Sequence, residues 1–233
     1  MKLTKLLAAM SLSSVSATAN AQDYHGVGYA GGSLGQGTNG YAGLVVAVPG
    51  ARLGHGLAVR GTLIGGNYRY DTGTGVRIHG KYIGGEAALV YQFSGDWGWS
   101  NISAGPRLTH TSLSPSDPDN KRDGSRWDVG TQIDGAFNFD PKWRLTYLGS
   151  VGIRDGAYLV KADVGPFIDS KSQTRIGVEG SLQGDPKYKA RGAGVFVGTQ
   201  FQKDAQIQLS AGIRDQSARK AGAYGAIATS FLF

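Results

Sequence analysis

Apolar and polar side chains alternate along much of this chain with a period of two residues. From Trp143 to Ile153 the odd-numbered positions are apolar or glycine, whereas Arg144, Thr146 and Ser150 occupy even-numbered ones. Similar alternation occurs near 76–93, 126–139, 158–168, 175–183, 206–214 and 221–233. Because strand side chains point alternately to two faces, each run predicts a β-strand with one apolar and one polar face. No long segment repeats apolar residues at a helical period, so an all-β fold is expected.

Turn-forming residues separate these runs and give a strand count. Asp, Gly and Pro cluster between them, as in Asp140-Pro141 and Gly184-Asp-Pro186. Weaker strands are expected near 26–34, 40–48, 57–71, 99–112 and 188–202. The total is twelve strands, with ten as the alternative because the first two candidates are rich in glycine.

Within the segment from 76 to 93, the apolar positions shift from even-numbered to odd-numbered residues. Val76, Ile78 and Tyr82 share one parity, whereas Leu89 and the apolar positions around it have the other. A β-bulge at Gly84-Gly85 would restore registry, since glycine tolerates the backbone angles that a bulge requires.

The first 21 residues resemble a secretory signal peptide. Lys2 and Lys5 precede a short apolar core, and Ala19-Asn20-Ala21 has the small-x-small pattern of a cleavage site. We therefore expect residues 1–21 to be removed and residues 22–233 to form one exported domain, whose length suits a single fold.

The composition indicates what the apolar faces contact. The chain has 38 glycines and no cysteine, and beyond residue 21 no apolar stretch reaches the 18 residues of a helical span. Few apolar residues are available for a water-soluble core, so lipid is expected to cover the apolar faces. The prediction is a transmembrane antiparallel β-barrel in the cell outer membrane. Both termini are expected in the periplasm. Aromatic residues near strand ends are expected to form two interfacial girdles: Tyr68, Tyr70, Tyr82, Tyr91, Phe93, Trp97, Trp99, Trp127, Phe139, Trp143, Tyr147, Tyr158, Tyr224, Phe231 and Phe233.

Charged residues of the predicted strands lie on the polar faces. On the lipid face near the bilayer centre each basic side chain would cost about 2–4 kcal/mol, so these faces are expected to point into the lumen. They carry Arg60, Arg77, His79, Lys81, Arg107, Arg126, Asp128, Asp134, Arg144, Lys161, Asp163, Arg175, Glu179, Lys189, Arg191 and Arg214, with basic groups in about threefold excess.

The side chains expected to face a solute are Arg77, Lys81, Arg107, Arg126, Arg144, Lys161 and Arg175. Two interpretations remain open. Cross-strand ion pairs could plug a narrow barrel, or a basic, water-filled passage could admit an anionic or sugar-like solute.

The longest connection, residues 113–124, is expected on the extracellular side, where it would offer an outward contact through Asp117, Asp119, Asn120 and Asp123. Alternating carboxylates can bind calcium, but the loop lacks a terminal glutamate, and Lys121 and Arg122 interrupt it. No metal site and no cofactor are predicted. The basic residues are dispersed through alternating strands, so nucleic acid is not an expected partner.

One pair of residues suggests catalysis. His110 and Ser112 are two apart, so they share a strand face, and a His-x-Ser pair resembles the motif of lipid A deacylases. Such a site needs a carboxylate to orient the imidazole, and neither Glu86 nor Glu179 has a spacing that argues for this role. No catalytic residue is therefore predicted, and this hydrolase is kept as an alternative.

Several segments resemble a known family. They are Gly65-Gly-Asn-Tyr-Arg-Tyr-Asp71, Leu89-Val-Tyr-Gln-Phe93, Leu113-Ser-Pro-Ser-Asp-Pro-Asp-Asn120 with Gly124-Ser-Arg126, and Val164-Gly-Pro-Phe-Ile168 with Ile176-Gly-Val-Glu-Gly180. Over about residues 57–200 the chain is similar to the cellulose biosynthesis protein BcsS family. The resemblance implies an exported barrel linked to bacterial cellulose production, with no established catalytic residues.

The expected function is therefore non-enzymatic: assistance in the assembly or passage of cellulose or a related exopolysaccharide at the outer membrane. Expected partners are outer-membrane lipid and lipopolysaccharide, with cellulose or another exopolysaccharide and its synthase or secretion complex. A purely structural scaffold is the other alternative. Cellulose is neutral, so a basic lumen matches it imperfectly.

Overall fold

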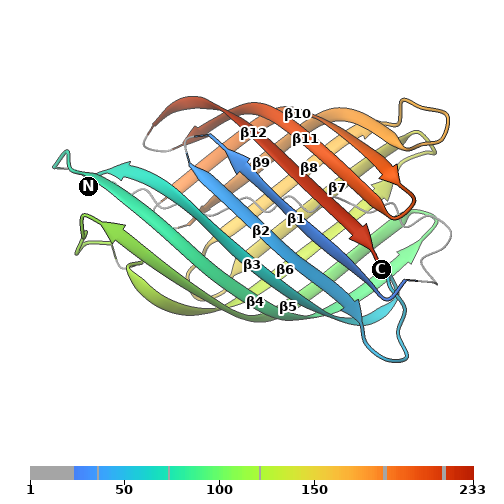
Figure 1. Ribbon diagram of the computed structural model, residues 1–233, viewed down its shortest axis with the longest axis horizontal. Coiled ribbons are helices and arrows are strands. Elements are labelled where there is room, and N and C mark those ends of the chain that lie inside the picture. The colour runs from blue at the N-terminus through green and yellow to red at the C-terminus, as the bar shows by residue number, and fades with distance from the viewer. Residues whose placement is uncertain (1–23, 36, 73, 121, 186–187, 217–218) are drawn as a thin grey trace.

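The computed structural model describes residues 24–35, 37–72, 74–120, 122–185, 188–216 and 219–233. They form twelve antiparallel strands: β1 (Gly26–Leu34), β2 (Thr38–Ala47), β3 (Gly56–Asp71), β4 (Arg77–Gly95), β5 (Gly98–Ser114), β6 (Gly124–Asn138), β7 (Trp143–Gly152), β8 (Tyr158–Pro166), β9 (Thr174–Asp185), β10 (Tyr188–Gln202), β11 (Ala205–Gln216) and β12 (Arg219–Leu232). Each strand pairs with its neighbours in sequence, and β1 also pairs with β12, which closes the barrel (Figure 1). The predicted fold and the count of twelve strands are confirmed.

The side chains alternate between the outer wall and the lumen, as the sequence pattern predicts. In β4, Ile83 and Leu89 are 66% and 67% exposed, whereas Ile78 and Val90 are each 1% exposed. The outer wall is apolar on every side of the barrel, and most inward side chains are buried and polar. No helix in the described ranges is long and apolar enough to cross a membrane.

The predicted bulge at Gly84-Gly85 is wrong. The pairing of β4 with β3 and with β5 passes through these glycines without a shift in register. The apolar parity changes because Ile78 and Tyr82 point into the lumen, where they pack with Tyr68 and Tyr70. The chemistry of the two faces changes along β4, but its backbone stays regular.

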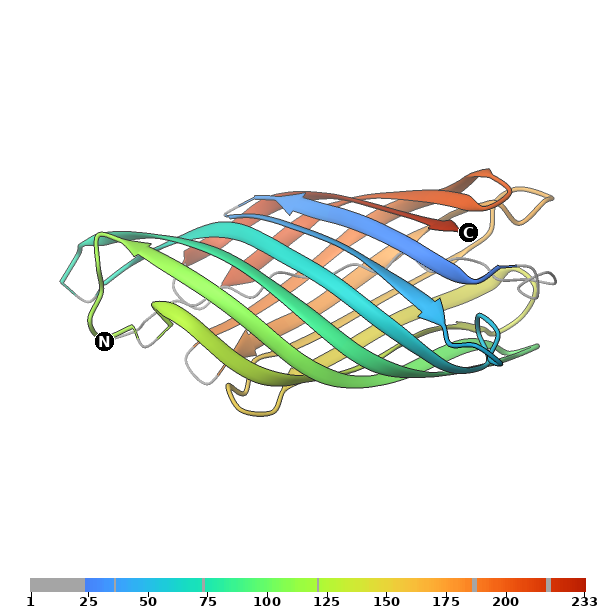
Figure 2. The same cartoon turned by 60° about the horizontal axis from the view of Figure 1, so that its bottom comes forward.

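The two ends of the barrel differ. At one end, which we call the terminal rim, the backbone N–H of His25 donates to the carbonyl of Phe233 at 2.7 Å. The opposite end, the distal rim, carries the β3–β4, β5–β6 and β7–β8 turns. Strands β3, β4 and β5 are long, and their hairpins project past the other strands at the distal rim (Figure 2).

Aromatic residues follow the girdle prediction only in part. On the outer wall at the terminal rim, neighbouring rings lie 5.3–6.4 Å apart along the series Tyr91, Phe93, Trp97, Phe137 and Phe139. The girdle prediction is wrong for Tyr68, Tyr70, Tyr82 and Tyr224, which are buried inside the barrel. The predicted signal peptide lies outside the described residues.

Candidate functional site: the charged lumen and its distal cap

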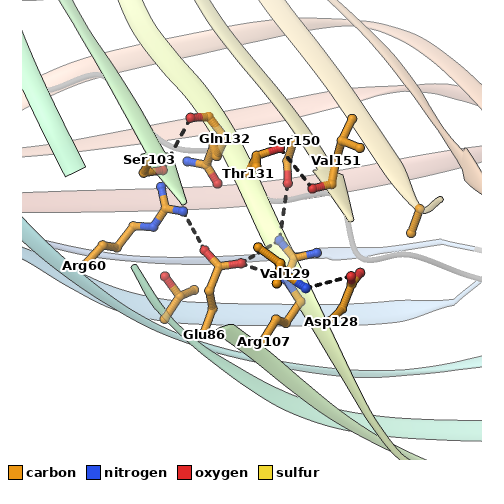
Figure 3. A network of polar contacts seen from close by, with 12 residues as sticks. Arg60, Glu86, Ser103, Arg107, Asp128, Val129, Thr131, Gln132, Ser150 and Val151 are labelled. Carbon is orange, nitrogen blue, oxygen red and sulfur yellow. Dashed lines mark hydrogen bonds and ion pairs between the residues drawn. The ribbon is translucent and has the colours of Figure 1, made fainter. Parts of the chain in front are cut away.

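A carboxylate between two arginines forms the centre of one lumen network. Glu86 of β4 accepts from Arg60 of β3 at 2.5 Å and from Arg107 of β5 at 2.6 Å (Figure 3). Arg107 also donates to Ser150 of β7 at 3.4 Å. Gly130 provides the space for these contacts, since a Cβ there would lie 2.3 Å from Glu86 Oε2. We call this set, together with Asp134, the Glu86 network.

Asp134 extends the Glu86 network on β6. It lies 3.7 Å from Arg60 and accepts from Asn101 at 2.9 Å and from Gln132 at 2.8 Å. The side chain of Asp134 is 1% exposed and that of Arg60 is 3% exposed. Buried charges are tolerated when they are paired and their remaining hydrogen-bonding groups are satisfied. The network therefore joins five consecutive strands through the interior.

A second set, the Glu179 network, occupies the other half of the lumen. Glu179 of β9 lies 3.0 Å from Lys161 of β8, and accepts from Ser210 of β11 at 2.9 Å and from Tyr224 of β12 at 2.6 Å. Arg175 pairs with Asp163 and donates to the carbonyl of Arg144 at 3.4 Å. Arg214 lies over the Tyr224 ring, 4.8 Å from its centroid.

Most of the charged side chains that make these contacts are buried. Arg60 and Asp134 of the Glu86 network and Asp163 and Glu179 of the Glu179 network are almost completely inaccessible to water. Six basic side chains, Arg60, Arg107, Arg144, Lys161, Arg175 and Arg214, face four carboxylates, Glu86, Asp134, Asp163 and Glu179. The four carboxylates offset four of these six positive charges, so an excess of two remains among these side chains. Of the two interpretations left open, the geometry favours the ion-paired plug.

A cluster of tyrosines packs inside the barrel near the distal rim. Tyr68, Tyr70 and Tyr82 pack with Ile78, and the Tyr68 and Tyr70 rings stack with their centroids 6.2 Å apart. Gly80 makes this packing possible, because a Cβ at that position would lie 2.3 Å from the Tyr68 ring.

The β5–β6 loop folds over this cluster. The Tyr70 hydroxyl donates to Asp117 at 2.6 Å and accepts from the Asn120 amide at 2.8 Å. Arg122 lies 3.8 Å from Asp155 in the β7–β8 turn, where burial raises the pKa of the Asp155 carboxyl. The loop is thus attached to the barrel on two sides. We call the tyrosine cluster and this loop the distal cap.

Replacing Tyr70 with phenylalanine should loosen the loop. The variant keeps the ring packing but loses two hydrogen bonds, each contributing about 0.5–1.5 kcal/mol. Amides of residues 115–123 should then exchange with solvent at least tenfold faster, as measured by hydrogen–deuterium exchange. Tyr91→Phe, on the outer wall, is the matched control and should leave this loop unchanged. Equal protection in the Tyr70 and Tyr91 variants would show that the hydroxyl does not hold the loop.

The structure places the predicted solute-facing residues in three locations. Arg107, Arg144, Lys161 and Arg175 lie in the lumen. Arg126 has the inward parity of β6 but is exposed at its distal end. The lumen prediction is wrong for Arg77, His79 and Lys81, which are exposed on the outer wall because β4 contains no bulge. It is also wrong for Arg191 of β10, which is exposed on the outer wall. Contact of the inward residues with a solute remains a prediction.

The predicted outward contact of the longest loop also needs correction. Asp117 is buried and Asn120 is only 2% exposed, because both turn toward Tyr70. Asp119 and Asp123 are exposed. Only the latter two acidic residues are therefore available to an external partner.

His110 and Ser112 lie together on the outer wall of β5. Ser112 Oγ is 3.4 Å from His110 Nε2, and Ser125 Oγ of β6 is 2.9 Å from His110 Nδ1. Ser125 thus occupies the position at which a hydrolase triad holds a carboxylate. A hydroxyl can fix the imidazole tautomer but cannot stabilise an imidazolium as a carboxylate does. The arrangement lacks that element of nucleophilic catalysis.

Among the site residues that the sequence prediction does not include, Glu86 and Tyr70 have central positions. Glu86 was not assigned to a face because it follows the supposed bulge, although Ile78, Tyr82 and Glu86 share one parity. Tyr70 was assigned to an interfacial girdle, and its partners Asp117 and Asn120 are about fifty residues away in sequence. An interpretation of β4 as a regular strand without a bulge would place Glu86 on the same face as Ile78 and Tyr82.

A closed twelve-stranded antiparallel barrel with an apolar wall and a polar interior is the architecture of the outer-membrane β-barrels. The model of one family, cellulose biosynthesis protein BcsS, matches residues 27–233. The chain belongs to this family. The resemblance seen over residues 57–200 is therefore confirmed and covers nearly all of the barrel.

Comparison with solved structures agrees with this fold. A ΔS2S3 mutant of the monoaromatic hydrocarbon channel TodX has a TM-score of 0.54 at 6% identity, covering 90% of this chain and 91% of that chain. The β-domain of the Bordetella autotransporter BrkA has a TM-score of 0.50 at 13% identity, covering 90% and 99%. A comparison with curated proteins gives no match. At these identities the two structures bear on the fold alone.

Proposed function

We propose that this chain is a non-enzymatic outer-membrane barrel that supports cellulose biosynthesis as an anchoring or assembly component, and not as an open pore. Membership of the cellulose biosynthesis family supports the proposed role in cellulose production. The observation that carries the proposal is the filled lumen, in which the Glu86 and Glu179 networks are buried and largely ion-paired. The apolar outer wall supports a membrane location, and we propose that residues 1–21 direct export there and are then cleaved.

The filled lumen argues against passage of a glucan chain in this conformation. A polysaccharide strand would have to displace paired charges from several strands at once, and breaking one buried pair costs about 3–5 kcal/mol. The distal cap also packs inside the barrel and would have to move if it lay in the path of the chain. A scaffold role requires neither obstacle to move, and it also removes the mismatch between a basic lumen and neutral cellulose.

The purified wild-type barrel should produce no steady ion conductance in a planar bilayer, because paired side chains leave little space for water or ions. The measurement is single-channel recording at several voltages, and the positive control is a known porin reconstituted in the same way. Steady conductance from the wild-type barrel would exclude the filled-lumen interpretation. A deletion strain complemented with the wild-type gene, scored for secreted cellulose, tests the pathway role separately.

The alternative of an outer-leaflet lipid hydrolase is less well supported. It would use His110 and Ser112, which do contact each other on the outer wall. However, Ser125 replaces the carboxylate that this chemistry needs. The geometry therefore gives the non-enzymatic proposal more support.

A further inference from the structure

The outer wall near the distal rim carries a group of basic side chains that neither lumen network uses. On β3 and β4 the exposed positions are occupied by Arg69, Arg77, His79 and Lys81, and β5 contributes His110. All five side chains are exposed. We call this group the distal basic patch. Its residues point away from the lumen because the neighbouring positions Tyr68, Tyr70, Ile78 and Tyr82 fill the barrel interior.

The strand register brings the patch residues side by side. Arg69 lies opposite His79, and Lys81 lies opposite Ser112 of β5. His110 lies one exposed position below Ser112, opposite Ile83. Cross-strand neighbours on one face have Cβ atoms about 4.5–5.5 Å apart, so these side chains form one surface.

The charge of the patch is only partly balanced. Asp71, directly opposite Arg77, lies 2.9 Å from it, and both side chains are well exposed. Among the described outer-wall residues of β3, β4 and β5 at this level, Asp71 is the only carboxylate. Arg69 and Lys81 remain as a concentrated positive charge, and the two histidines add hydrogen-bonding groups.

The position of the patch relative to the bilayer follows from β4. Its outward positions from Phe93 to Ile83 are apolar or glycine, and the next three are Lys81, His79 and Arg77. The apolar run covers eleven residues, and a tilted transmembrane strand needs about 9–11 to cross the hydrocarbon layer. Lys81 therefore lies just beyond the hydrocarbon, at the depth of the lipid head groups on the side away from the terminal rim.

We propose that the distal basic patch binds the phosphate groups of lipopolysaccharide in the outer leaflet. Phosphates are the anions present at this depth, and exposed basic side chains at a membrane surface attract anionic head groups. Arg69 can donate two parallel hydrogen bonds to a phosphate, whereas Lys81 acts as a point charge. The apolar wall below the patch, with Ile83, Leu63 and Leu108 exposed, is suited to contact the acyl chains of the same lipid.

This inference depends on the proposed outer-membrane location with periplasmic termini, but not on the role in cellulose production. Membrane fractionation of cells tests the location, whereas lipid binding is measured on the purified barrel. A wrong location can therefore be distinguished from a failure to bind lipopolysaccharide.

The test compares the wild-type barrel with the double variant Arg69→Ala/Lys81→Ala. The full barrel is purified in detergent and titrated with lipopolysaccharide and, separately, with the same lipopolysaccharide after enzymatic dephosphorylation. The double variant should bind intact lipopolysaccharide at least tenfold more weakly than the wild type does. The wild type should bind the dephosphorylated lipid more weakly than the intact lipid by a similar factor. High salt should also weaken the binding of intact lipopolysaccharide to the wild type, because salt screens the attraction between exposed charges.

The matched control is Arg191→Ala. Arg191 is also an exposed outer-wall arginine near the distal rim, on β10, but it is paired with Asp215 at 3.0 Å. This variant should bind lipopolysaccharide as the wild type does. Wild-type affinity in the double variant, or equal wild-type affinity for intact and dephosphorylated lipid, would overturn the proposal. Because all three residues are exposed, each variant should keep the heat-dependent gel mobility of a folded barrel.

Discussion

Replacing Glu86 with alanine should lower the free energy of unfolding of the barrel by about 3–5 kcal/mol. Glu86 is the shared acceptor of Arg60 and Arg107, at 2.5 Å and 2.6 Å. Its removal leaves two guanidinium groups buried, with Asp134, 3.7 Å from Arg60, as the remaining carboxylate of the network. The cost arises chiefly from uncompensated buried charge, because the net value of an intact buried pair is often small.

Denaturant titration of the barrel refolded into lipid vesicles measures this loss. The matched control is Asp71→Ala, which removes the carboxylate that pairs with Arg77 on the exposed outer wall. An exposed pair contributes about 0–1 kcal/mol, so the control should be nearly neutral. Similar small losses in both variants would show that water reaches the Glu86 network, and would contradict a filled lumen.

Much of the fold was predictable because a membrane barrel is patterned on both faces. Lipid requires apolar residues at every second position, and the interior accepts polar ones, so each strand carries its own signal. The alternation in β7 and β11 identified faces that the structure confirms. Even the glycine-rich β1 and β2 form strands, in which Tyr29 and Tyr41 point into the lumen and supply buried contacts.

The faces of the distal half of β4 were predicted wrongly, because the alternation pattern assigns apolar side chains to the lipid-facing wall. Beyond the hydrocarbon layer the outer wall faces head groups and water, so Lys81 and Arg77 are stable there. At the same level Ile78 and Tyr82 fill the interior, which reverses the pattern without any change in register. Without the register of β4, a reversal of faces at the edge of the hydrocarbon layer gives the same sequence pattern as a bulge.

The site was less predictable than the fold. Arg60 and Asp134 are on β3 and β6, and no local spacing joins them. Glu86 and Arg107 are directly opposite in register, but that relation appears only when β4 is continuous. The polar faces correctly indicated which charges point inward. They could not indicate how completely these charges are paired, because pairing depends on contacts across the closed barrel.

A single arginine placed at two depths on β4 should distinguish a lipid-covered wall from a water-covered one. Leu89 and Ile83 are both outward apolar residues, 67% and 66% exposed. Leu89 lies near the middle of the eleven-residue apolar run, and Ile83 lies at its distal end beside Lys81. In a bilayer, Leu89→Arg should cost about 2–4 kcal/mol and Ile83→Arg about 0–1 kcal/mol, because the penalty for a charge decreases toward the interface.

The measurement is the free energy of unfolding of both variants in lipid vesicles, relative to the wild type. Because the two side chains are equally exposed, a wall surrounded by water would give two small and similar changes. A difference of at least about 1.4 kcal/mol, a factor of ten in the folding equilibrium constant, would therefore report the middle of the hydrocarbon layer around Leu89 and its edge at Ile83. Equal costs would contradict the membrane depth assigned to β4, and with it the head-group position of the distal basic patch.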